Sequence, residues 1–139
     1  MQIMKDGKFS KYKNSNLKKK EFQQLIEAIQ VLLYDVKIYK NENLSLQELA
    51  DRLNSNRHKV SQAINMEFNK NFYQLINCCR IEESKRLIEN QERLNIKTIM
   101  YEVGFVSKSS FYNAFKRATG KTPLQYRRST KRKEENYFP

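Results

Sequence analysis

Glycine, proline, cysteine, histidine and tryptophan are all scarce in this chain of 139 residues. It contains three Gly, two Pro, two Cys, one His and no Trp. Three glycines leave no loop able to cradle a phosphate, and one His with two neighbouring Cys does not make a recognisable zinc pattern. No nucleophile and base stand together in a catalytic pattern. We therefore expect no cofactor, no metal site and no enzyme.

Membrane and export signals are also missing from the sequence. No apolar run approaches the roughly 20 residues needed to span a bilayer, and Lys5, Asp6 and Lys8 interrupt the N-terminus where a signal peptide would be apolar. Cys78 and Cys79 are adjacent, which is a poor geometry for a disulfide between them. We therefore expect a reduced, cytoplasmic compartment. The Cys pair either packs on a helix, which we favour, or acts as a redox switch.

Positive charge is abundant but lies at the two ends of the chain. The net charge is +12 and the pI is about 9.7, which suits a polyanionic partner. Residues 1–20 hold seven Lys and one Asp, and residues 116–133 hold eight Lys or Arg and no acid. Over residues 21–115 the two signs balance at twelve each. The charged ends fit either solvated tails or a nucleic-acid surface.

One motif occurs twice. An apolar helix, a short turn and a second helix that starts at a small polar residue span residues 44–64 (the first unit) and residues 94–115 (the second unit). The equivalent pairs are Leu44 and Leu94, Leu46 and Ile96, Leu49 and Ile99, Leu53 and Val103, Asn56 and Ser107, Val60 and Phe111, Ala63 and Ala114, and Ile64 and Phe115. Two copies are too few for a solenoid. Each unit instead indicates a helix-turn-helix, which places one helix in a DNA major groove.

Apolar periodicity predicts an almost entirely helical chain. The expected helices cover residues 21–40, 45–53, 56–67, 72–89, 96–103 and 108–118, and a last helix opens at Thr122 and Pro123. Ser45 with Glu48 three residues on is typical of a capping box, and Asn54 tolerates the left-handed turn that follows the first helix of the first unit. The helix at residues 72–89, about 27 Å long, should join the two units.

The second unit carries the more specific motif. It comprises Ile99-Met100-Tyr101-Glu102-Val103-Gly104-Phe105, then Ser107 to Phe111, Phe115-Lys116 and Gly120 to Arg127. This pattern closely resembles the AraC/XylS family of bacterial transcription regulators, and the first copy fits it from Leu46 to Leu87. The resemblance implies an all-α fold in which two helix-turn-helix units, joined by one long linker helix, bind one DNA site. It departs at Met100 and Ser84, where the family usually has Ala.

The sequence divides into four segments on this interpretation. They are a basic flexible segment (1–20), an additional N-terminal helix (21–43), the tandem helix-turn-helix domain (44–128) and a charged flexible tail (129–139), with irregular structure expected from Arg127 onward. The N-terminal helix has apolar residues at heptad positions a and d: Phe22, Leu25, Ile29, Leu32, Val36 and Tyr39. Ile26 and Leu33 widen this face, which favours packing on the first unit and a monomer; a homodimer seam is the alternative.

The second helix of each unit has an apolar face that we predict to point inward: Val60, Ala63 and Ile64 in the first unit, and Phe111, Ala114 and Phe115 in the second. The outward-facing side chains of the same helices are the candidate DNA contacts. Gln62 and Asn113 are equivalent, and an amide can pair bidentately with adenine in the major groove. The family resemblance places base-reading side chains at these positions. The predicted DNA-binding set is Arg57, His58, Ser61, Gln62, Asn65, Lys108, Ser109, Ser110, Tyr112, Asn113 and Lys116. The alternative for any single one of them is an ordinary solvated side chain that makes no DNA contact.

These features predict a sequence-specific, double-stranded-DNA-binding transcription regulator, or the output domain of a larger one. The alternative is an architectural module that coats or bends duplex DNA with little sequence choice. Family members usually carry a separate sensor domain, which we do not expect within these residues, and RNA polymerase is a further candidate partner. The sequence leaves open whether the protein is an activator or a repressor.

Overall fold

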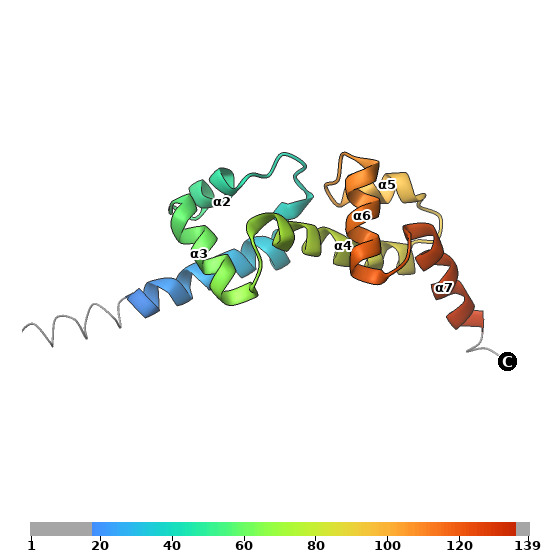
Figure 1. The fold of residues 1–139 in the computed structure, drawn as a ribbon, viewed down its shortest axis with the longest axis horizontal. Coiled ribbons are helices and arrows are strands. Elements are labelled where there is room, and N and C mark those ends of the chain that lie inside the picture. Colours follow the sequence, from blue (N-terminus) through green and yellow to red (C-terminus); the bar gives the residue numbers. More distant parts are fainter. Residues whose placement is uncertain (1–17, 136–139) are drawn as a thin grey trace, which may run out of the picture.

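The computed structural model describes residues 18–135, and every regular element in this range is a helix (Figure 1). In chain order these are a helix over residues 18–30, the π-helix η1 (Val31–Asp35), the 3-10 helix η2 (Ile38–Lys40), α2 (Leu46–Arg52), α3 (Arg57–Phe68), α4 (Phe72–Asn90), α5 (Ile96–Glu102), α6 (Lys108–Thr119) and α7 (Pro123–Glu135). The all-α fold with two helix-turn-helix units and a long linker helix is confirmed. Of the flexible segment expected at residues 1–20, residues 18–20 are helical instead, and residues 1–17 lie outside the described residues.

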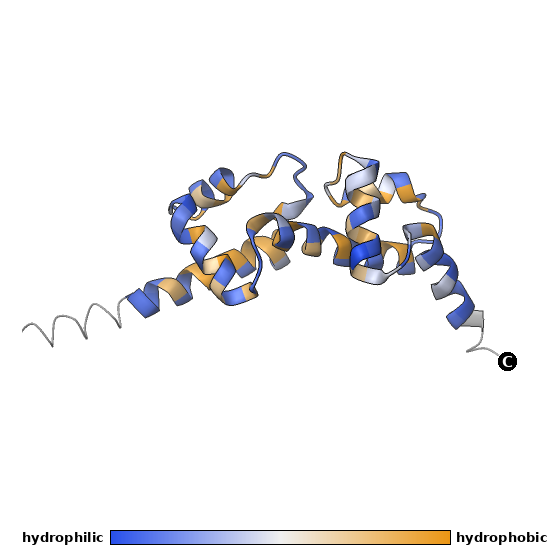
Figure 2. Cartoon of the chain, in the orientation of Figure 1, coloured by the Kyte–Doolittle hydropathy of each residue, from blue (hydrophilic) through white to orange (hydrophobic). Residues whose placement is uncertain are grey.

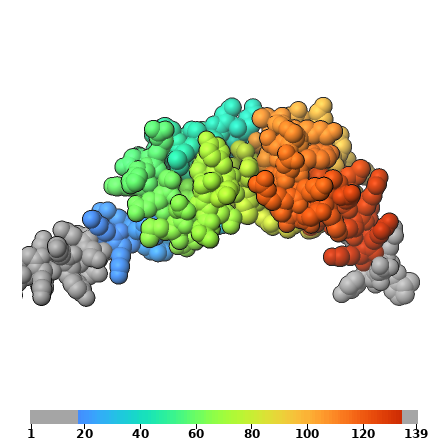
Figure 3. Space-filling model, viewed as in Figure 1, coloured from blue at the N-terminus to red at the C-terminus, as the bar shows by residue number. Residues whose placement is uncertain are grey.

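Helix α4 is the axis of the molecule and belongs to both of its cores. The pair α2 and α3 packs at one end of α4, and α5, α6 and α7 pack at the other (Figure 1). Figure 2 shows apolar positions along the length of α4. Phe72, Leu75 and Ile76 join the core of the first unit, whereas Leu87 and Ile88 join the core of the second. The two units form an arch, with the N-terminal helix at one foot and α7 at the other (Figure 3).

Side-chain caps begin the five helices from α2 to α6. In each case an oxygen of the residue before the helix accepts a hydrogen bond from the backbone N–H three residues on, which satisfies one of the free donors of the first turn. The distances are 3.1 Å at Ser45, 2.9 Å at Asn56, 2.8 Å at Asn71, 2.7 Å at Asn95 and 3.3 Å at Ser107. The predicted starts of these helices agree with the structure to within one residue.

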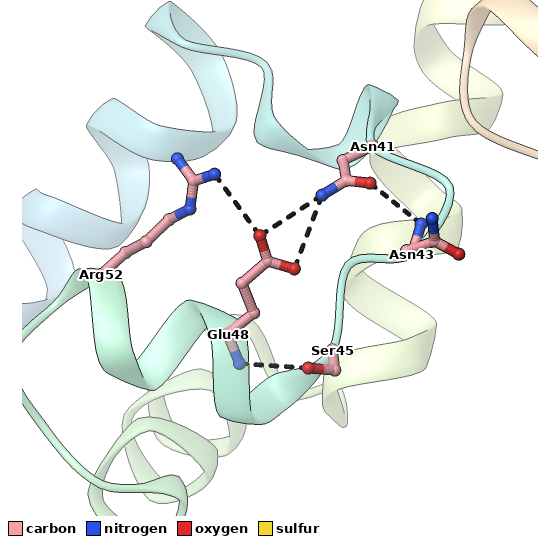
Figure 4. Close-up of polar contacts among 5 residues, drawn as sticks. All are labelled: Asn41, Asn43, Ser45, Glu48 and Arg52. Carbon is pink, nitrogen blue, oxygen red and sulfur yellow. Dashed lines mark hydrogen bonds and ion pairs between the residues drawn. The ribbon is translucent and has the colours of Figure 1, made fainter.

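The capping box expected at Ser45 is only half formed. Ser45 accepts from the Glu48 N–H, but the Glu48 carboxylate turns toward Asn41 and Arg52 (Figure 4). The Asn41 amide lies 3.4 Å from it and the Arg52 guanidinium also 3.4 Å. Asn41 in turn accepts a hydrogen bond from the Asn43 N–H at 3.0 Å. The side chain of Glu48 therefore holds α2 to the loop that precedes it. A complete capping box occurs instead at Asn71, at the start of α4.

The N-terminal helix packs on the first unit but stops earlier than predicted. Ile26, Ile29 and Leu33 are at most 1% exposed and join the same core as α2 and α3. The continuous helix expected to Lys40 is wrong, because Lys37 adopts a left-handed conformation with φ 57° and η2 follows. The break leaves Val36, one of the apolar heptad positions expected to pack, 57% exposed.

Helix α7 corrects the prediction of an irregular tail from Arg127. The helix continues to Glu135, so residues 129–135 of the expected flexible tail are helical, and residues 136–139 lie outside the described residues. Contacts distant in sequence explain the difference. The Tyr126 hydroxyl donates to Glu89, and the Arg127 guanidinium donates to the Gln91 carbonyl at 3.3 Å. Both partners lie at the end of α4, so they dock α7 there.

Candidate nucleic-acid interface

The turn before the second helix of each unit (α3 or α6, called the recognition helix below) has the same geometry in both units. The Ser55 N–H donates to the Ala50 carbonyl at 2.9 Å, and the Phe105 N–H donates to the Met100 carbonyl at 3.0 Å. Met100 is buried, so the larger side chain fits without opening this bond. Asn54 has φ 50°, which confirms the left-handed residue predicted at the turn of the first unit. Gly104, at the equivalent position of the second unit, also has a positive φ, of 106°.

Recognition helix α3 is anchored by one fully buried face. Val60, Ala63 and Ile64 are 0% exposed, as the sequence predicted for its inward positions. The opposite face carries the predicted contacts of the first unit. Of these, Arg57, His58, Gln62 and Asn65 are exposed and Ser61 is half-buried. The burial of one face fixes which side chains the other presents.

Recognition helix α6 is held by an aromatic cluster. Phe111 and Phe115 are 0% exposed, and their ring centroids lie 5.8 Å apart in an edge-on arrangement. Ala114 is only partly buried, which is less than the inward position predicted for it. Of the predicted contacts of the second unit, Lys108, Ser109, Ser110, Asn113 and Lys116 are exposed and Tyr112 is half-buried. The buried aromatic face of α6 therefore fixes which side chains face solvent, as the buried aliphatic face does in α3.

The equivalent amides Gln62 and Asn113 are both free to bind. Neither side chain makes a hydrogen bond to another part of the chain between residues 18 and 135. Their N–H and C=O groups are therefore available to an external partner. The two predicted sets stay in separate units on α3 and α6 and do not form one cluster (Figure 1).

A groove between α5 and α6 is lined by two of the predicted contacts and by two residues that the sequence prediction did not include. It has a volume of about 480 Å³, and Lys108 and Tyr112 line it together with Lys97 and Tyr101 of α5. The Lys108 ammonium lies 5.3 Å from the Tyr112 ring centroid, a cation–π distance. Lys97 and Tyr101 are exposed, and the latter is 51% exposed. No motif marked them, because their position beside α6 depends on how the two helices pack.

The two cysteines differ in their surroundings. Cys78 is exposed, whereas Cys79 is half-buried and packs against the first core. Burial, followed by the neighbouring Cys78, raises the pKa of Cys79 to about 11. A thiol with a raised pKa forms little of the reactive thiolate at neutral pH. Cys79 therefore fits a role in packing better than a role as a redox switch.

A family model described as a helix-turn-helix domain matches residues 49–129. The chain belongs to the AraC-type helix-turn-helix family. The family is one of DNA-binding transcription regulators, and the resemblance noted in the sequence is confirmed. Within the described residues, none of the helices combines the length and the apolar content needed to cross a membrane.

Relatives of this AraC-type chain include regulators and isolated DNA-binding domains. An uncharacterized HTH-type transcriptional regulator from Staphylococcus aureus (strain COL) is 30% identical over 92 residues, which cover 66% of this chain and 12% of the relative. The C-terminal domain of AraT, a response regulator from Geobacillus stearothermophilus, is 30% identical with a TM-score of 0.65, covering 78% of this chain and 84% of that domain.

A second similar structure, the DNA-binding domain of AdpA in complex with a target DNA, has a TM-score of 0.68 at 18% identity and covers 76% of this chain and 93% of that one. At that identity the likeness shows the fold. The chain spans about 12% of the length of the first curated relatives.

Proposed function

We propose that this chain binds one duplex DNA site sequence-specifically, with α3 and α6 each entering a major groove, as a transcription regulator or as the DNA-binding part of one. The observation that carries the proposal is the repeated amide: Gln62 and Asn113 are equivalent, exposed and free of other partners within residues 18–135. Each lies on a helix whose opposite face is fixed in a core. Such a side chain can read adenine.

The remaining predicted residues fit two roles around these amides. His58, Ser61, Ser109 and Tyr112 lie on the same faces and are candidates for base contacts. Arg57, Asn65, Lys108, Ser110 and Lys116 are candidates for phosphate contacts, which position a protein on DNA without reading its sequence. Lys97 joins this second group because it lines the groove with Lys108.

We propose further that the chain acts in the cytoplasm, by binding and without catalysis, and occupies its site as a monomer. The buried positions Ile26, Ile29 and Leu33 support a monomer, since a dimer seam through this face would compete with the first core. RNA polymerase and a sensor domain are the protein partners that the family implies. The alternative, a module with little sequence choice, is favoured only by the basic helix α7, where Arg128, Lys131, Arg132 and Lys133 are exposed.

The test begins with selection of a preferred site from a random duplex pool. Affinities for that site and for random duplex are then compared at one fixed salt concentration, because salt changes both. Replacing Gln62 or Asn113 by Ala should cost about 1–3 kcal/mol at the selected site and little on random duplex. Gln24→Ala and Asn90→Ala remove matched, exposed amides outside the recognition helices and should leave both affinities unchanged.

Equal losses on both kinds of DNA would show that the two amides only hold the backbone. A wild-type chain with the same affinity for the selected site and for random duplex would contradict the proposal and favour the architectural alternative.

A further inference from the structure

The segment that links the N-terminal helix to the first unit lies between the two units. This connector, residues 37–41, contains η2 and contacts the middle of α4. It also meets the turn of the second unit, because the Tyr39 and Lys40 carbonyls approach Gly104. The connector thus contacts α4 and the second unit, and it is joined directly to the first unit along the chain.

One side chain of α4, Arg80, joins all of these parts. Its Nε donates to the Tyr39 carbonyl at 2.8 Å, and its Nη2 donates to the Asn41 carbonyl at 3.0 Å. Its guanidinium carbon lies 5.6 Å from the ring centroid of Phe105, in the turn of the second unit. A guanidinium is planar, stays charged and presents several donors in fixed directions, so it can hold two carbonyls and an aromatic ring at once.

Gly104 brings the second unit directly against the same contacts. A Cβ on this residue would lie 2.5 Å from the Tyr39 carbonyl oxygen and 2.8 Å from the Arg80 Nε. No side chain fits in that space. The turn backbone, the connector carbonyl and the guanidinium are therefore in mutual contact.

A buried carboxylate one turn further along α4 holds the other end of the connector. Glu83 is 6% exposed and lies 3.6 Å from the Lys37 ammonium and 3.8 Å from the Lys40 ammonium. The hydrogen bond from Arg86 lowers the pKa of Glu83 against the opposing effect of burial, and the two lysines lower it further. A charged Glu83 attracts both connector lysines, and the contact of Asn41 with Glu48 (Figure 4) continues the link into α2.

We propose that Arg80 is a positioning residue for DNA binding: through the connector it fixes the orientation of the second unit relative to the first, and so sets the half-site spacing that the chain accepts. This inference rests on the proposed function, because spacing has meaning only if both units bind one site. The apolar side chains that pack in the two cores do not include Arg80, so these apolar contacts remain when the guanidinium is replaced. Loss of Arg80 should therefore loosen the angle between the units while each unit stays folded.

The test uses the full chain and the variant Arg80→Lys, which keeps the charge but loses the planar fork. The DNA probes are the selected site, the same site with one or two base pairs inserted between its halves, and each half-site alone. Arg93→Lys is the matched control, because Arg93 is an exposed arginine beyond the end of α4. The wild-type chain and the control should bind the native spacing best.

Arg80→Lys should bind the native spacing about tenfold more weakly and bind the inserted sites almost as well as the native one. Its affinity for each half-site should equal that of the wild-type chain. Wild-type spacing preference in the variant would overturn the inference. An equal loss on half-sites and on the full site would also overturn it, because a general folding role produces that result.

A second variant, Glu83→Gln, keeps the size of the side chain but removes the charge that attracts the connector lysines. It should relax the spacing preference in the same direction and by less. Circular dichroism at the assay temperature checks that the variants are folded. If Arg80→Lys unfolds, the spacing preference of Glu83→Gln tests the inference in its place. If both variants unfold, the inference is overturned in favour of a role in folding. A wild-type chain that prefers no site contradicts the proposed function itself and is recognised before any variant is compared.

Discussion

A methyl group added at Gly104 should destabilise the fold far more than one added at Gly120, although both glycines have positive φ. Gly120 ends α6 with φ 74° and has nothing within 4 Å of an added Cβ. Its replacement by Ala should cost about 1–2 kcal/mol, the strain of an L-residue in the left-handed region. Gly104→Ala has that strain, at a φ of 106°, and an overlap at 2.5 Å with a backbone carbonyl.

The overlap determines the size of the difference. To reach ordinary contact, the connector has to move away from the turn, and overpacking of this kind costs about 1–3 kcal/mol. The same movement weakens the charge-assisted hydrogen bond from Arg80 to Tyr39, worth about 1.5–3 kcal/mol. Strain, overpacking and a partial loss of this hydrogen bond together give an expected loss of roughly 3–6 kcal/mol for Gly104→Ala, a large part of the stability of an ordinary domain.

Urea unfolding followed by circular dichroism measures both variants. The free energy of unfolding should fall much further for Gly104→Ala, with an unchanged dependence on urea concentration if both variants unfold in one step. Equal losses would refute the reasoning, because they would mean that the turn of the second unit does not press on the connector in solution. Arg80 would then lack one of the contacts through which it acts on the second unit.

Three further changes probe the N-terminal helix, the basic end and the docking of α7. Ile29→Asp should lower the free energy of unfolding, measured by thermal unfolding, by about 3–5 kcal/mol because it buries an unpaired charge. The control Val36→Asp, at an exposed position of the same heptad series, should change it by about 0.5 kcal/mol or less. If the wild-type chain is a dimer and Ile29→Asp gives a folded monomer, the helix is instead a dimer seam. Deleting residues 129–139 should flatten the dependence of log affinity on log salt by about 0.9 for each lost phosphate contact, and an unchanged slope would exclude such contacts. Burial and the hydrogen bond to Glu89 raise the pKa of Tyr126 to about 12. The contribution of Tyr126 to the free energy of unfolding is therefore complete below pH 10 and is lost as the pH rises from 10 to 12. Tyr126→Phe should remove this decrease from the pH dependence of the free energy of unfolding.

The helices of the two units could be predicted because their signals are local. A capping side chain stands at the start of each helix, and a buried apolar residue recurs every three or four positions. The repeat added a second, independent indication, since Val60 and Phe111 are both fully buried at equivalent positions. Outward positions followed from the same periodicity, which is why Gln62 and Asn113 could be placed on exposed faces.

The features that the sequence did not reveal depend on contacts between distant residues. The apolar pattern continues to Tyr39, yet the helix ends before Lys37, where Glu83 of α4 attracts the Lys37 ammonium and Arg80 of α4 binds the Tyr39 carbonyl. Helix α7 likewise extends beyond Arg127 because its first turns dock on the end of α4. Local propensity carries no information about such partners, so these boundaries were wrong while the boundaries inside the two units were right.

The two units share a backbone pattern but present different chemistry, and this difference bears on the form of the DNA site. The turn bonds agree within 0.1 Å, at 2.9 and 3.0 Å, so the recognition helices leave their turns in the same way. The residues beside the amides differ, with Ser61 in the first unit and Tyr112 in the second. A symmetric dimer reads a palindrome because two identical helices face it, whereas one chain with two unlike helices in fixed order has no such symmetry. We therefore expect the selected site to be asymmetric, with unlike halves, and a palindromic selected site would mean that two chains bind together.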